Sequence, residues 1–114
     1  MADCLFCKIV SGEISSETVY QDDLVTVFED INPAAPVHLL IVPNEHIASV
    51  NEVEEEQRLL LGHLITTAKQ MAAEKGIQAS GYRLIINTGP DGGQEVFHLH
   101  MHLLGGGKMK HPMG

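Results

Sequence analysis

The chain has 114 residues, of which 44% are hydrophobic and 19% are charged, a balance typical of a single globular domain. Seven Lys and Arg against fifteen Asp and Glu give a formal net charge of −8, so the chain repels polyanions. This charge argues against binding to a nucleic acid polymer or to an anionic membrane, whereas a mononucleotide carries few charges and stays compatible.

The N-terminal residues lack the basic and apolar regions of a secretory signal, and no apolar run approaches the roughly 20 residues that span a bilayer. Cys4 and Cys7 follow at a CxxC spacing. Such a pair in a chain without a signal predicts a reducing compartment, with metal or redox chemistry in place of a structural disulfide. We therefore expect a cytoplasmic protein.

The first expected elements are short. The apolar run 5–10 fits either a strand or a helical turn, because short runs do not separate the two, and Gly12 closes it. Residues 18–21 and 24–28 are rich in β-formers and are separated by two aspartates, which predicts a hairpin. The proline-containing segment 32–36 reads as a loop.

A buried strand and one long helix are expected next. Residues 37–42 form an apolar run that Pro43 stops. Asn51 is placed to cap a helix whose first turn is acidic, and Gly76 is placed to end it. The expected buried face of this helix recurs at helical spacing and consists of Leu61, Leu64, Ile65, Ala68, Met71 and Ala72.

The C-terminal third predicts two more strands, at 82–87 and 96–104, joined by a flexible glycine-rich loop. Together these elements predict an α+β fold with an antiparallel sheet of about five strands and one long helix packed on a face.

A row of histidines interrupts the last expected strand. His98, His100 and His102 occupy alternate positions, so on a strand their side chains point to one face. Three buried imidazoles are costly without partners, which favours a functional site over plain packing. Two adjacent members can share a metal ion, but the outer pair lies too far apart for all three to do so. The other interpretation is catalytic: one imidazole attacks while its neighbours orient it and hold an anion.

The loop before this strand fits the catalytic interpretation. Gly92 and Gly93 let the backbone approach an anion, and Asn87 can donate to the same group. A glycine-rich loop alone is equally typical of an ordinary connection. Only its position beside the histidines makes it a candidate phosphate site.

The run 98–104 matches the His-φ-His-φ-His-φ-φ signature of the histidine triad (HIT) superfamily, where φ is apolar. Segments 28–38, 43–47 and 91–94 also resemble the Hint branch of this superfamily, in its bacterial form. The resemblance runs from about residue 5 to residue 106. It implies a single HIT domain over 1–114, with a short N-terminal helix added to the sheet and long helix, which dimerises.

The resemblance also implies an activity, a purine nucleoside phosphoramidase that cleaves AMP-amine conjugates through a nucleotidyl-histidine intermediate. His100 matches the nucleophile, His102 the residue that contacts the phosphate, His98 the residue whose backbone orients the nucleophile, and His38 a fourth histidine in the proton relay. The matching nucleotide-binding positions, which also include His100 and His102, are Leu5, Phe6, Ile9, Phe28, Asp30, Ile31, Asn87 and Gly93. Catalysis of this kind requires no cofactor.

Each of these binding residues also has a structural reading. Phe28, Ile9 and Leu5 are individually common as core residues, and Asp30 is also a good turn residue before Asn32. Their assignment to the nucleotide rests on the resemblance.

Two features depart from the family pattern. Glu95 stands where eukaryotic members carry a serine that contacts the phosphoramidate, so we leave it out of the catalytic set. The tail 108–114 has no tryptophan, unlike the eukaryotic form, so the preference for a leaving group does not carry over.

A second site is suggested by the cysteines. Some bacterial relatives bind a structural zinc with a CxxC pair, and the resemblance adds His46 and His98 to Cys4 and Cys7 as its ligands. Two reduced, packed cysteines explain the same residues equally well. His63 on the helix and His111 in the tail receive no role.

Three functions remain in competition. The first is the phosphoramidase. The second is dinucleoside polyphosphate hydrolysis or nucleotidyl transfer with the same nucleophile. The third is a regulatory protein that binds a nucleotide or zinc and turns over only incidentally.

Overall fold

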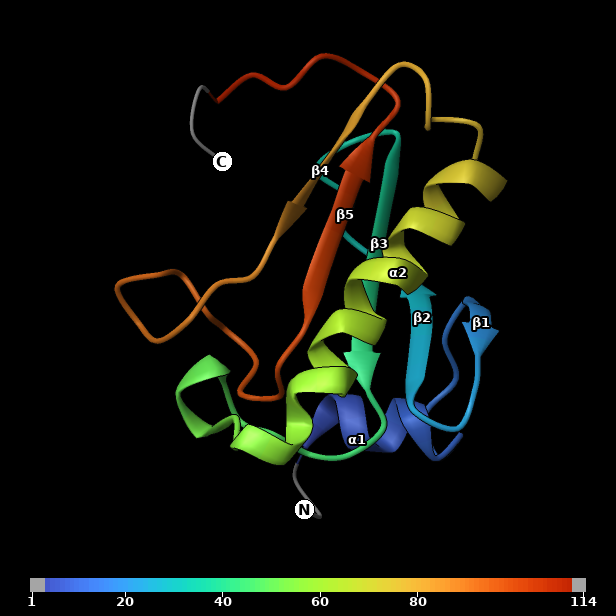
Figure 1. Ribbon diagram of the computed structural model, residues 1–114. Helices are drawn as coiled ribbons and strands as arrows, with labels where there is room; N and C mark the ends of the chain where they lie inside the picture. The colour runs from blue at the N-terminus through green and yellow to red at the C-terminus, as the bar shows by residue number, and fades with distance from the viewer. Residues whose placement is uncertain (1–3, 112–114) are drawn as a thin grey trace.

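One antiparallel sheet organises the molecule (Figure 1). A computed structural model describes residues 4–111, and within this range the sheet has five strands in the order β1-β2-β3-β5-β4. The elements are α1 (Leu5–Val10), β1 (Thr18–Gln21), β2 (Val25–Glu29), β3 (Val37–Pro43), two short 3-10 turns (Val50–Glu52 and Glu55–Gln57), α2 (Arg58–Glu74), β4 (Tyr82–Ile85) and β5 (Met101–Gly105). The predicted α+β class, with a long helix and a short N-terminal helix, is confirmed.

The β1–β2 hairpin forms where it was predicted. Oδ1 of Asp22 accepts hydrogen bonds from the backbone N–H groups of Leu24 and Val25, both at 2.8 Å. This is the local turn that Asp favours, because its side chain closes onto its own backbone.

The two faces of the sheet bury different clusters. Figure 1 shows α2 lying in front of the strands, and its apolar side packs against residues such as Val27, Ile41 and Leu103. The opposite face carries Phe28, Leu40 and Val42, which pack with Phe6 of α1. The side chains alternate between these clusters along each strand, as the pleat requires. The helix α1 therefore lies over the face that also carries His102.

Helix α2 begins later than predicted. The expected cap at Asn51 is wrong, since Ser49 caps a separate 3-10 turn and accepts a hydrogen bond from the N–H of Asn51 at 3.1 Å. Ile65 of the predicted apolar face is 53% exposed, whereas Leu60, which was not part of that face, is buried because it lies one turn before Leu64 on the side that meets the sheet. The end at Gly76 is confirmed by its φ of +74°.

The last two strands are shorter than predicted. β4 ends at Ile85, and β5 begins only at Met101. The segment 96–100 does not join the sheet because the N–H of Leu99 donates to the loop oxygen of Ile47 at 2.7 Å. Neither helix in the described part of the chain is long and apolar enough to cross a membrane.

Candidate active site

The three histidines of the motif are close together, but they do not lie on one strand. Only His102 belongs to β5, and His98 and His100 precede it. The expectation that all three share one strand face is therefore wrong for His98, whose ring turns toward the cysteines. His100 and His102 remain neighbours, with ring centroids 5.1 Å apart.

The tautomer of His100 follows from one contact. Its Nδ1 lies 2.7 Å from the main-chain oxygen of His98. A carbonyl oxygen only accepts hydrogen bonds, so Nδ1 carries the proton and Nε2 keeps its lone pair. Phe6 packs edge-on against the ring, with centroids 5.1 Å apart. In its neutral form the buried His100 thus presents the lone pair of Nε2 in a fixed direction.

A second chain of hydrogen bonds determines which ring nitrogen carries the proton in His38 and in His102. The N–H of Ala34 donates to Nδ1 of His38 at 3.0 Å, so the proton of His38 is on Nε2. That Nε2 lies 2.9 Å from Nδ1 of His102 and 3.4 Å from Oδ2 of Asp30. Donation to His102 leaves the proton of His102 on its own Nε2, the atom turned away from His38.

Burial keeps this relay uncharged. Desolvation lowers the pKa of His102 to about 4, helped by the nearby His100 and His38 and opposed by Asp30. Desolvation also lowers the pKa of His38, again against Asp30. Both imidazoles are therefore neutral at pH 7, which the hydrogen-bond chain requires.

The residues expected around a purine base divide into two groups. Phe6 and Phe28 are buried and meet edge to face, with centroids 5.4 Å apart, and the half-buried Ile9 packs beside them. Leu5 and Ile31 are exposed, Ile31 at 89%. The structure thus brings the first group together within a core cluster and leaves the second at the surface.

Asp30 combines a turn and a site contact. Its Oδ1 accepts a hydrogen bond from the N–H of Asn32 at 2.8 Å, as a turn residue does. Its other oxygen faces His38. Its assignment to a ribose stays a prediction.

The glycine-rich loop is shaped by its own contacts. A Cβ on Gly92 would lie 2.4 Å from the main-chain oxygen of Thr88, so only glycine fits there. Gly93 has a φ of +83°, and its N–H donates to Pro90 at 3.0 Å. Asn87 is half-buried at the start of this loop. These facts give both glycines a structural role, and their phosphate contacts stay predictions.

Gln94 is a site residue to which sequence reasoning gave no role. Its buried side chain accepts from the N–H of Gly89 at 2.9 Å and donates to the oxygens of Ala48 and Val96 at 2.8 and 3.1 Å. It ties the loop before the histidines to the loop after β3. The partner at Ala48 is 46 residues away, so no local pattern could reveal it.

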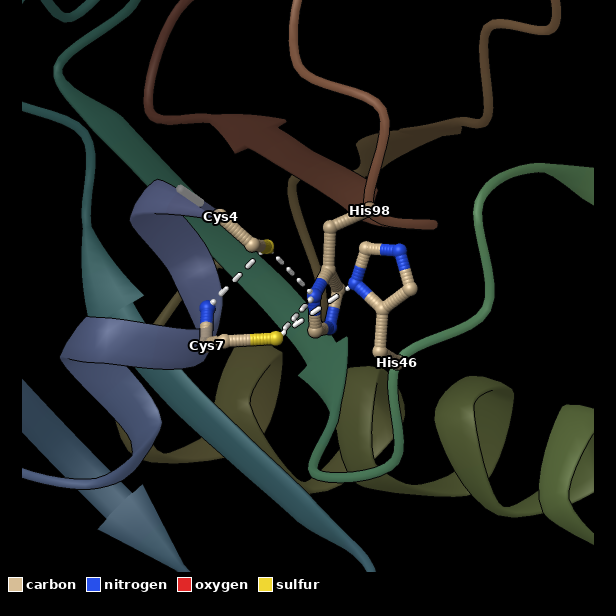
Figure 2. Close-up of side chains that lie close together, drawn as sticks. All are labelled: Cys4, Cys7, His46 and His98. Atoms are coloured by element: carbon tan, nitrogen blue, oxygen red, sulfur yellow. Dashed lines mark hydrogen bonds between the residues drawn. The ribbon is translucent and has the colours of Figure 1, made fainter. Parts of the chain in front are cut away.

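The cysteines and two histidines form a separate cluster (Figure 2). One ligand atom from each of Cys4, Cys7, His46 and His98 lies within 4.8 Å of all the others. Sγ of Cys4 is 3.3 Å from Nδ1 of His98, and Sγ of Cys7 is 3.4 Å from Nδ1 of His46. Figure 2 shows Cys4, which caps α1, and Cys7, which lies within α1, facing the imidazoles of His46 and His98.

This donor set fits a tetrahedral metal ion. Nε2 of His98 lies 2.8 Å from the oxygen of Pro43 and must donate to it, so Nδ1 presents a lone pair to both sulfurs. Tetrahedral zinc with ordinary bond lengths places its sulfur and nitrogen ligands about 3.5 Å apart. Burial and the adjacent Cys4 raise the pKa of Cys7 to about 11, so metal binding displaces a thiol proton.

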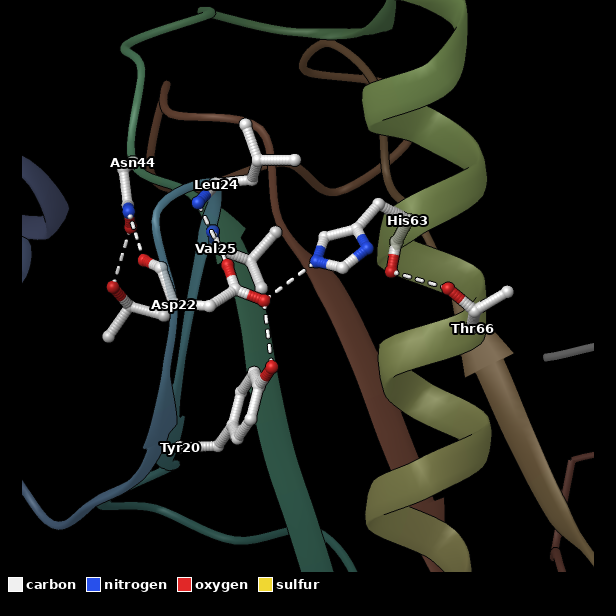
Figure 3. Close-up of polar contacts among 8 residues, drawn as sticks. Tyr20, Asp22, Leu24, Val25, Asn44, His63 and Thr66 are labelled. Atoms are coloured by element: carbon white, nitrogen blue, oxygen red, sulfur yellow. Dashed lines mark hydrogen bonds and ion pairs between the residues drawn. The ribbon is translucent and has the colours of Figure 1, made fainter.

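The remaining histidine on the helix has a structural partner (Figure 3). His63 of α2 lies with Nε2 2.8 Å from Oδ2 of Asp22, which also accepts from the hydroxyl of Tyr20 at 2.8 Å. His63, which received no role from the sequence, therefore has a structural partner in the turn between β1 and β2. Glu95 is exposed, in keeping with its exclusion from the catalytic set.

The five-stranded antiparallel sheet with one long helix, and the cluster of histidines beside the central strand β3, define the class of protein to which this chain belongs. The family model described as HIT domain matches residues 11–109. A protein of Escherichia coli strain K12 named purine nucleoside phosphoramidase is 56% identical over 104 residues, covering 91% of this chain and 87% of that protein. The chain belongs to the HIT domain family.

Solved structures agree with this placement. A HIT family hydrolase from Legionella pneumophila is 47% identical, with a TM-score of 0.95 over 98% of this chain and 100% of that one. A histidine triad protein from Clostridium difficile is 45% identical, also at 0.95, over 97% of this chain and 96% of that one.

Proposed function

We propose that this chain hydrolyses the P–N bond of purine nucleoside phosphoramidates through a covalent intermediate on Nε2 of His100. The main support is the tautomer that the main-chain oxygen of His98 imposes on His100, 2.7 Å away. The name of the Escherichia coli relative, at 56% identity, supplies the substrate class.

The reaction divides into two displacements. The lone pair of His100 Nε2 forms a bond to phosphorus while the P–N bond breaks, and the electrons of that bond leave with the amine, which takes a proton from water as it departs. A water molecule then forms a bond to phosphorus, gives up a proton to solvent and displaces the imidazole. The products are a free amine and a nucleoside monophosphate, and His100 returns to its neutral state.

The neighbouring imidazole supports the phosphate. Its hydrogen-bond chain from Ala34 and His38 leaves a proton on Nε2 of His102. We assign this N–H to a phosphate oxygen, where it offsets the charge that develops in the transition state. Asn87 and Gly93 are assigned to the same phosphate from the family pattern. For this, the N–H of Gly93 must leave the oxygen of Pro90 and donate to the phosphate instead.

The nucleoside is assigned to the surface beside α1. Phe6 packs against the ring of the nucleophile and meets Phe28 edge to face, and we assign this pair to the base. Leu5, Ile9 and Ile31 are assigned to the same base from the family pattern. We assign the carboxylate of Asp30 to the ribose, where its oxygens accept hydrogen bonds from the hydroxyl groups. AMP conjugates are the expected substrates.

We assign a structural zinc ion to the Cys4, Cys7, His46 and His98 cluster. Four protein ligands leave no open position, so the ion supplies no catalytic chemistry. It supports the fold by joining α1 to the segment before β5. It also holds His98, whose main-chain oxygen orients the nucleophile.

A homodimer in the cytoplasm completes the proposal. Leu59 on α2 is 89% exposed, and Ile65 and Phe97 are about half exposed. β4 is an edge strand of the sheet. Exposed apolar side chains and an open strand edge are features that a second copy can cover.

The test is a comparison of substrates with product identification. We expect an AMP-amine to be turned over faster than a diadenosine polyphosphate, and rapid quenching to trap a nucleotide on the peptide that contains His100. Preferential cleavage of the polyphosphate would favour the rival hydrolase, and a nucleotide mapped to another residue would contradict the mechanism.

A further inference from the structure

Positive charge gathers at one place on this acidic chain. A cavity of about 440 Å³ lies between the 34–36 loop, the β4–β5 face and the tail 107–111. Its lining includes Arg83, Lys108 and Lys110, which are three of the seven Lys and Arg residues, together with His111. No Asp or Glu lines it, although the chain has fifteen.

These cations have no acidic partners within residues 4–111. Arg83 instead donates from Nη1 to the main-chain oxygen of His111 at 2.8 Å, which holds the tail over the cavity. An arginine has five N–H donors, so this single contact leaves others available. The arrangement is suited to an anion that enters from solvent.

The cavity lies on the same face of the sheet as His38 and His102. Arg83 pairs with Leu104, which pairs in turn with His38, so these three side chains lie in one row on one face. Ile85 and His102 form the next row along the same strands. Neighbouring strands are about 4.8 Å apart and successive same-face residues about 6.6 Å apart. The guanidinium of Arg83 is therefore within reach of a group attached to phosphorus at His102.

The cavity also lies on the opposite side of the histidines from the proposed nucleoside surface. Phe28 is on β2, beyond β3, whereas Arg83 and Ile85 are on β4, beyond β5. If the base lies near Phe28 and the phosphorus near His100, as proposed above, the side of the phosphorus toward β4 is left for the other substituent, the leaving amine.

We propose that the cavity bounded by Arg83, Lys108 and Lys110 binds the leaving group and selects amines that carry a negative charge, such as a carboxylate. This inference rests on the proposed phosphoramidase function. It defines the substrate class as AMP conjugates of acidic amines. Because Lys108 and Lys110 are exposed, they attract an anion to the entrance of the cavity through their charge and do not hold it in one fixed position.

The test uses three AMP conjugates of equal length, made with β-alanine, propylamine and ethylenediamine, whose free ends are anionic, neutral and cationic. We expect kcat/KM to fall in that order, by about five- to tenfold per step, the size of one or two solvent-accessible ion pairs. In the double variant Lys108→Gln/Lys110→Gln the ratio of anionic to neutral substrate should fall toward one. Lys69→Gln, an exposed lysine on α2, is the matched control and should keep the ratio.

Binding separates this inference from the proposed activity. The dissociation constants of the same three conjugates are measured by calorimetry on His100→Ala, with and without the two lysine substitutions. A preference for the anionic conjugate that disappears with the lysines supports the subsite, even if the wild-type chain hydrolyses none of the three and the phosphoramidase proposal fails. Equal constants, or a preference unchanged by the double variant, overturn the subsite whatever the activity.

Discussion

Nδ1 of His100 lies 2.7 Å from the main-chain oxygen of His98, and the side chain of His98 is itself held by the oxygen of Pro43 at 2.8 Å. A ligand of the proposed metal site therefore also orients the proposed nucleophile. The two sites are joined through a single residue, so a change at one is transmitted to the other through the backbone of His98.

The first prediction concerns the nucleophile. His100→Ala should reduce turnover of an AMP-amine by about four orders of magnitude or more, because it removes the Nε2 to which the covalent bond is assigned. AMP binding should remain measurable by calorimetry, since the nucleoside contacts are elsewhere. A folded variant that keeps more than a small fraction of the rate would refute the assignment of His100.

Metal content tests the cluster in Figure 2. Protein purified without added metal should contain about one zinc ion per chain, and Cys4→Ser should lose it and unfold at a lower temperature. His111→Gln, outside the cluster, should keep the ion. Acid should also release the metal, because protons compete for the thiolates and imidazoles. Full zinc content in Cys4→Ser would show that the ion binds elsewhere.

Much of the fold was predictable because local patterns carry it. The β1–β2 hairpin follows from aspartates between β-forming runs, and the helix end at Gly76 follows from a glycine after a basic residue. The start of α2 and the length of β5 were predicted wrongly. In both cases a contact that the local pattern does not show replaces the expected one. The N–H of Leu99, for example, donates to the oxygen of Ile47 and does not pair with a strand.

The candidate site likewise has residues that a local sequence pattern identifies and residues that only folding brings together. The histidine row stands out at alternate positions, so His98, His100 and His102 were identifiable from the sequence. The role of Gln94 and the charge cluster around Arg83 depend on residues brought together by folding, and no spacing in the chain marks them.

The buried relay predicts how stability depends on pH. The pKa of His102 falls from 6.5 to about 4 on folding, so between these values the unfolded chain binds a proton that the folded chain does not. This contribution to stability is complete above pH 6.5 and is lost as the pH falls toward 4. The urea midpoint should be lower at pH 5 than at pH 7, and the drop should be smaller in His102→Gln. An equal drop in both proteins would assign the effect to other groups.

The contact of Asp22 with His63 should stabilise the packing of α2 against the hairpin (Figure 3). Burial would raise the pKa of Asp22, but hydrogen bonds from His63, Leu24, Tyr20 and Val25 outweigh it and hold the pKa well below its usual value. The carboxylate thus stays ionised in the folded chain throughout the neutral range. Its stabilising contribution is present above pH 3.8 and is lost only in stronger acid.

A double-mutant cycle measures this contact. Because both side chains are partly exposed, His63→Ala should cost about 1 kcal/mol, or roughly 4 °C in Tm. Asp22→Asn and the double variant complete the cycle, which should give a coupling of about 0.5 to 1 kcal/mol. Turnover should be unchanged in His63→Ala. Additive effects of the two single changes would show that they do not interact.

The last prediction compares two glycines. Gly92→Ala places a Cβ 2.4 Å from the oxygen of Thr88, so the loop must shift, and with it the approach to Asn87 and Gly93. We expect a large loss of kcat/KM with a smaller loss of stability, because the loop is exposed and the core is not touched. Gly62→Ala is the control: it lies within α2, its new Cβ meets no atom within 4 Å, and it should stabilise the chain by about 1 kcal/mol without changing the rate. Normal turnover in Gly92→Ala would mean that the shape of this loop is not needed for phosphate binding, since an alanine there cannot leave the loop undisturbed.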